Sequence, residues 1–131
     1  MIHIRFYLSR EDEIVGFNVE GHGEKTVCAA ISALAINTVN SIELLADTNY
    51  ECEYKNELFI DFRLTDKPDS DSRILLKALM LGVRSVAEEY PGEVEIVESG
   101  EWRVLNSQLS TLNSQLSTLN SQLIRKGVFN D

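Results

Sequence analysis

The chain has few basic residues and few cysteines, and these shortages exclude several classes of function. Of its 131 residues, only 12 are Lys or Arg against 21 Asp or Glu, so the formal net charge is −9. Binding to a phosphate backbone requires a basic surface, so we expect no direct contact with nucleic acid. The sequence contains two cysteines, Cys28 and Cys52, and no C-x-x-C pair. We therefore expect free thiols, no structural metal site and no cofactor.

Long apolar runs and a signal-like N-terminus are also missing. No uninterrupted apolar run approaches the ~18 residues that span a membrane, so we expect no membrane partner. The opening MIHIRFYLSR lacks the basic-then-apolar order of a signal peptide, which favours a cytoplasmic protein. The content of 44% hydrophobic and 25% charged residues is typical of a globular domain with a single core.

Two kinds of hydrophobic periodicity divide the first part of the chain. Alternating apolar residues predict strands over 2–8, 13–19, 50–54, 57–64 and 93–97. Helical spacing predicts helices over 27–46 and 72–90, with N-caps at Thr26 and at Asp69 or Ser70. The order β-β-α-β-β-α-β predicts an α+β fold, in which two helices pack on one face of a mainly antiparallel sheet.

The C-terminal segment has a different character. Leucines recur by fours and threes over 105–123, LNSQLSTLNSQLSTLNSQL, which is heptad spacing. The intervening residues are weak helix formers without charged pairs, and so exact a repeat is also typical of low-complexity expansion. We expect a folded domain over 1–100 and a repeat tail over 101–131. The tail is either an ordered helix that pairs subunits in a homodimer or a low-complexity segment.

The segment EGHGEKTVCAAIS, residues 20–32, places a cysteine where a helix is expected to begin. A helix N-terminus lowers the pKa of a thiol, and its backbone N–H groups can stabilise an oxyanion, so Cys28 is a candidate nucleophile. His22 follows a strand at a turn flanked by Gly21 and Gly23, which allow close approach and unusual backbone angles. Its imidazole could act as a base beside Cys28. A buried structural cysteine beside an unrelated turn fits the same spacing.

The residues around this pair carry a resemblance to a known family. Gly-His, then Val-Cys-Ala-Ala-x-Ser, then Thr-x-Asn resemble the signature of the ribosomal-processing cysteine protease family, Prp. In this chain they are Gly21, His22, Val27, Cys28, Ala29, Ala30, Ser32, Thr38 and Asn40. The resemblance covers roughly residues 1–98 and implies a small α+β fold.

The resemblance also implies a function and roles for individual residues. It implies a cysteine endopeptidase that removes the N-terminal extension of a large-subunit ribosomal protein, so the expected partner is a peptide or a ribosomal protein precursor. By the same resemblance Cys28 is the nucleophile and His22 the general base. Ser32 lies one helical turn beyond Cys28, and either lines the site or is an ordinary helix hydroxyl.

Two departures from the family pattern favour an alternative. Family members have a longer, glycine-containing segment between His and Cys than the GEKTV of residues 23–27, and commonly an acidic residue where Lys25 stands. Glu24 could replace that residue as the carboxylate that orients His22. One alternative is therefore a non-catalytic Prp-like domain that binds a ribosomal or peptide partner. Another is a dimeric structural module whose tail drives association.

Other candidate residues have weaker support. His3 alternates with apolar residues along the first strand, so we expect it on the sheet surface. Cys52 lies between Glu51 and Glu53, whose carboxylates would raise its pKa and make it a poor nucleophile. The acidic residues between 88 and 95 are typical of a solvated edge.

Overall fold

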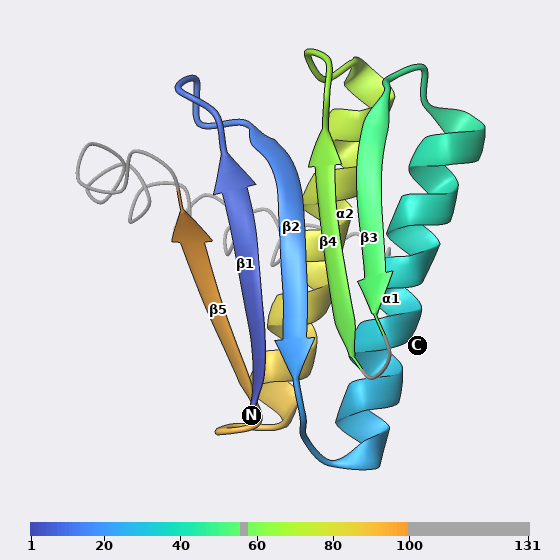
Figure 1. The fold of residues 1–131 in the computed structure, drawn as a ribbon. Coiled ribbons are helices and arrows are strands. Elements are labelled where there is room, and N and C mark those ends of the chain that lie inside the picture. The colour runs from blue at the N-terminus through green and yellow to red at the C-terminus, as the bar shows by residue number, and fades with distance from the viewer. Residues whose placement is uncertain (56–57, 100–131) are drawn as a thin grey trace, which may run out of the picture. The chain divides into compact units, whose positions relative to one another are not determined.

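The computed structural model describes residues 1–55 and 58–99, which form a five-stranded sheet and two helices (Figure 1). The elements in chain order are β1 Ile2–Leu8, β2 Ile14–Gly21, α1 Lys25–Leu45, β3 Tyr50–Lys55, β4 Phe59–Leu64, α2 Ser70–Glu89 and β5 Val94–Ser99. The predicted element order and α+β class are confirmed. The expectations for residues 101–131, including the heptad helix, lie outside the described residues.

The strands lie side by side in the order β3-β4-β2-β1-β5. The pairs β1–β2, β2–β4 and β3–β4 are antiparallel, which confirms the mainly antiparallel sheet. The pair β1–β5 is parallel, because the chain crosses over through α2 before β5 returns beside β1. Both helices cover the same face of the sheet (Figure 1).

The core lies between that face and the helices. Phe6, Phe17 and Phe62 are opposite one another on β1, β2 and β4, and all three are completely buried. The rings of Phe17 and Phe62 stack with centroids 5.3 Å apart. Burying an aromatic side chain of this size stabilises the fold by about 1.5–3 kcal/mol. This row of rings therefore holds the antiparallel part of the sheet against the helices.

Helix α1 corrects the expectation about membrane-spanning length. It is the one helix among residues 1–55 and 58–99 that is long and apolar enough to cross a membrane by length and composition. The core helix of a globular domain passes the same test, and α1 buries an apolar stripe against the rest of the domain. The buried apolar members of that stripe are Val27, Ile31, Ala35, Val39 and Ile42.

The two helices begin with different capping arrangements. The predicted cap of α2 at Asp69 is confirmed: its carboxylate accepts a hydrogen bond from the Ser72 N–H, and the Ser72 hydroxyl completes a capping box. The predicted cap of α1 at Thr26 is wrong. The Glu24 carboxylate accepts from the Thr26 N–H at 3.2 Å, so Glu24 is the N-cap and α1 begins at Lys25.

Candidate active site at the start of α1

The turn between β2 and α1 depends on one glycine. Gly21 has φ +117°, and a Cβ there would lie 2.3 Å from the Met1 carbonyl oxygen, so only glycine fits. This turn places His22 just beyond the end of β2. Gly23, which we expected to provide similar freedom, has no positive φ. A Cβ on Gly23 would instead lie 3.3 Å from the Glu93 carboxylate, so the residue serves close packing.

Cys28 lies in the first turn of α1 and is half-buried. Its thiol donates a weak hydrogen bond to the Gly23 carbonyl oxygen at 3.5 Å, which holds the sulfur against the preceding segment. Its backbone N–H donates to the Glu24 carbonyl oxygen at 2.9 Å. The Cys28 amide is thus already bonded within the helix.

Two carboxylates meet the segment between His22 and Cys28. The Glu24 side chain caps the helix through one carboxylate oxygen, and the expectation that it orients His22 stays a prediction. The Glu24 backbone N–H in turn approaches the Glu93 carboxylate, at 3.5 Å. Glu93 belongs to the turn before β5 and is partly exposed, which is compatible with the expected solvated edge. Sequence spacing carries no signal for a contact between segments so far apart.

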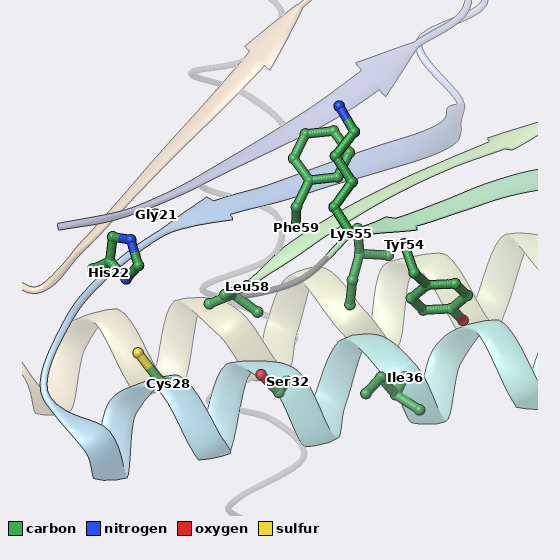
Figure 2. A pocket seen from close by; sticks show the side chains of 10 residues that line it. Gly21, His22, Cys28, Ser32, Ile36, Tyr54, Lys55, Leu58 and Phe59 are labelled. Carbon is green, nitrogen blue, oxygen red and sulfur yellow. The ribbon is translucent and has the colours of Figure 1, made fainter.

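His22, Cys28 and Ser32 line one pocket of about 530 Å³, together with Gly21. Figure 2 shows Cys28, Ser32 and Ile36 along the same face of α1, and the Cys28 sulfur points toward the end of β2 that carries His22. The structure therefore brings together the predicted pair and the predicted supporting serine. It leaves the Glu24 side chain at the helix cap, and Gly23 contributes its carbonyl oxygen to Cys28.

The opposite wall of the pocket comes from the β3–β4 hairpin, which sequence reasoning did not connect with the site. The hairpin residues that line the pocket are Tyr54, Lys55, Leu58, Phe59 and Ile60. Their alternation identified them as strand residues, but no local pattern places a hairpin beside the start of a helix. This wall gives the pocket a largely apolar side next to the thiol and imidazole.

Two side chains at the mouth of the pocket are open to solvent. Ile36 on α1 is 42% exposed and Tyr54 on β3 is 52% exposed. The pKa of Tyr54 is raised to about 12, mainly by burial and next by a hydrogen bond with Cys52, so its hydroxyl is neutral at physiological pH. On the outer side of the hairpin, the Lys55 ammonium lies 4.6 Å from the centre of the Phe59 ring. Ile36 and Tyr54 thus contribute apolar surface and no charge to the mouth of the pocket.

The remaining cysteine and histidine lie away from the pocket lining. Burial raises the pKa of the Cys52 thiol, as expected in direction. The predicted cause was wrong: Cys52 faces the core side of β3, and its neighbours Glu51 and Glu53 face the other side, because side chains alternate along a strand. His3 lies on the outer face of the sheet, where its Nδ1 is 3.0 Å from a Glu95 carboxylate oxygen.

Comparisons with known proteins agree with the fold. The family model described as cysteine protease Prp matches residues 1–95. No curated protein sequence matches the chain. The ribosomal processing protease Prp of Staphylococcus aureus, solved with a covalently linked product peptide, is similar at TM-score 0.72 and 21% identity, covering 76% of this chain and all of that one. The same protease with a substrate peptide gives TM-score 0.71 and 21% identity, with the same coverage. The protein SMU.848 of Streptococcus mutans gives TM-score 0.63 and 27% identity, covering 75% of this chain and 96% of that one.

Proposed function

Because this chain belongs to the cysteine protease Prp family, we propose that it is a cysteine endopeptidase with Cys28 as nucleophile and His22 as general base. The observation that carries the proposal is the shared pocket, in which a thiol on the first turn of α1 and an imidazole at the end of β2 lie beside an apolar wall. A helix N-terminus favours the thiolate, and a nearby imidazole can accept its proton.

The proposed reaction proceeds through a thioester. His22 accepts the Cys28 proton as the sulfur attacks the carbonyl carbon of the substrate peptide bond. The C–N bond breaks as the imidazolium gives that proton to the leaving amine. A water molecule, deprotonated by His22, then attacks the thioester, which releases the carboxylic acid product and restores the thiol. The thiol must first leave the Gly23 carbonyl oxygen, to which it donates in the described arrangement.

We propose that the substrate is the N-terminal extension of a large-subunit ribosomal protein precursor. The resemblance of the Cys28 motif to the ribosomal-processing family supports this, as does the likeness in fold to a protease solved with substrate and product peptides. We further propose that the enzyme acts on this substrate in the cytoplasm. We also propose a homodimer, which the solvent-exposed Leu44 and Leu45 at the end of α1 would help to form.

The test is cleavage of a synthetic peptide that spans the end of such an extension and the start of the mature protein. Cys28→Ala and His22→Ala should each lower kcat/KM about a thousandfold or more, because each removes a group that acts on the reacting atoms. Cys52→Ala is the matched control and should cleave like the parent chain, because Cys52 does not line the pocket. Full activity in Cys28→Ala would contradict the proposal.

The second candidate is a peptide-binding domain without catalysis. The short segment 23–27 and the thiol held on the Gly23 carbonyl oxygen favour it. Mass spectrometry separates the two candidates. The protease forms a thioester on Cys28 that is trapped when peptide and enzyme are quenched in acid, and it releases two fragments. The binding domain retains the intact peptide, and Cys28→Ser binds it equally well.

A further inference from the structure

Strand β3 is a sheet edge that leads directly into the proposed active site. In the part of the chain that the structure describes, β3 pairs only with β4 and ends the strand order. Its last two residues, Tyr54 and Lys55, line the same pocket as His22 and Cys28. Figure 1 shows β3 running toward the end of the molecule at which α1 begins. A chain laid along this edge would therefore continue into the pocket.

The hydrogen-bonding pattern shows which backbone groups of β3 point outward. The Thr65 N–H donates to the Asn49 carbonyl oxygen at 2.9 Å, and these two residues are directly opposite in the register of β3 with β4. Directly opposed pairs of an antiparallel ladder alternate between bonded and non-bonded. Residues 51, 53 and 55 are therefore bonded to β4. The N–H and C=O groups of Cys52 and Tyr54 point away from β4, toward the open edge.

The side chains of the same two residues point toward the helices. Tyr54 and Cys52 are opposite Ile60 and Phe62, which are buried in the core. A residue of an added strand that bonds to Tyr54 would turn its side chain to the same face. There it would meet the exposed apolar surface of Ile36 and Tyr54 at the mouth of the pocket.

We propose that the peptide substrate binds as an additional strand along the open edge of β3, through the backbone groups of Cys52 and Tyr54. Main-chain hydrogen bonds supply affinity independent of sequence, and the space beside Ile36 and Tyr54 selects an apolar side chain at alternate substrate positions. The inference rests on the proposed function, since it names how the substrate of that same pocket is held.

The first test alters only the substrate. In the ribosomal-protein extension peptide cleaved by the parent chain, each backbone amide is N-methylated in turn. Strand addition predicts that KM rises about tenfold at every second position, where an N–H bonds to β3, and changes little at the positions between. The inference would be overturned if the rise in KM did not alternate along the peptide, or if it were confined to the residues next to the cleaved bond.

The second test alters only the edge. Cys52→Pro removes an outward N–H without removing a bond to β4, and proline is tolerated on an edge strand when that N–H faces outward. Cys52→Ala is the matched control, because it keeps the N–H and loses the same thiol. We expect the proline variant to melt like the alanine variant and to show KM about tenfold higher with similar kcat.

The two tests separate this inference from the proposed function. If cleavage requires Cys28 but the alternation is absent, or if Cys52→Pro has the KM of Cys52→Ala, strand addition is wrong and the protease remains. If Cys28→Ala cleaves like the parent, the proposed function itself is wrong. If Cys52→Pro fails to fold, the N-methyl series decides the question alone.

Discussion

At the scale of single residues, this domain uses side chains and one glycine to fix features that periodicity does not reveal. Gly21 allows the close passage of the β2 end past Met1, and so determines where His22 stands. Glu24 caps α1, and so determines that the helix begins at Lys25 and that Cys28 lies in its first turn. Each of these local features affects the positions of residues in the candidate site.

Replacing Gly21 with alanine should both destabilise the domain and impair the site. The left-handed backbone costs an L-residue roughly 1–2 kcal/mol, and the clash with the Met1 carbonyl adds to that cost. Gly92 is the matched control, because it also has a positive φ but has nothing within 4 Å of the position that a Cβ would occupy. Urea unfolding should show a loss of at least about 2 kcal/mol for Gly21→Ala and about 1 kcal/mol for Gly92→Ala. Equal losses would mean that the close passage is unimportant.

A polar group on the outer face of the sheet gives a second prediction at this scale. Burial raises the pKa of Asp61, but hydrogen bonds from Tyr7 at 2.5 Å and Asn18 at 3.2 Å, with the charge of Arg63, outweigh it and hold the pKa below its usual range. Asp61 therefore contributes stability that is present above the ordinary carboxyl pKa and is lost as the pH falls through the lowered value.

Tyr7→Phe should raise the pKa of Asp61 and cost about 1 kcal/mol at neutral pH, because the hydrogen bond is only partly shielded from water. NMR titration of the Asp61 carboxyl carbon measures the pKa directly. Because the raised pKa lies closer to the ordinary carboxyl value, the variant loses less stability than the parent as the pH falls, and the gap in stability between the two narrows below about pH 4. An unchanged Asp61 titration in Tyr7→Phe would show that this hydrogen bond has no energetic role.

At the scale of elements, helix α2 begins in a network of hydrogen bonds around Asp69, which the sequence predicted as a candidate N-cap. Asp69 caps the helix, and its other carboxylate oxygen accepts from the Asp47 N–H at 2.8 Å, just after the end of α1. The hydrogen bonds from the Asp47 and Ser72 backbones hold the pKa of Asp69 far below its usual range. The one side chain thus joins the start of α2 to the end of α1.

Asp69→Asn should retain much of the cap but lose its charge, whereas Asp69→Ala should lose both. We expect the melting temperature at neutral pH to fall in the order parent, Asn, Ala. Because the folded pKa is lowered, the charge stabilises above the ordinary pKa of about 3.9 and this stabilisation fades as the pH falls below it. The gap in melting temperature between parent and Asp69→Asn should therefore narrow below about pH 4. A gap that stays constant down to about pH 2 would contradict this account.

At the scale of the whole molecule, the core described by the structure is formed entirely by residues of the segment from β1 to β5. Its buried apolar residues run from Ile2 to Val83, and β5 forms the edge of the sheet beside β1. The family match ends at residue 95, within β5. The repeat of residues 105–123 is therefore not needed to supply any of the buried apolar residues described.

A chain ending at residue 100 should fold cooperatively and melt within a few degrees of the full chain. Differential scanning calorimetry of the two chains checks this. Sedimentation of the same pair tests the homodimer: if the tail drives association, only the full chain is dimeric, and if the exposed end of α1 drives it, both chains are. A truncated chain that fails to fold would show that the tail contributes to the stability of the domain.

The sequence by itself determined the elements and the chemical identity of the candidate pair. Strand and helix periods depend on neighbouring residues, so β1, β4 and α2 were predicted close to their limits, and the motif around Cys28 identified the family. Tertiary structure decided what depends on contacts between distant segments. Examples are the parallel pairing of β5 with β1, the approach of Glu93 to the segment before α1, and the hairpin wall facing Cys28. Such contacts form only when the whole core packs, because no local pattern specifies which elements become neighbours.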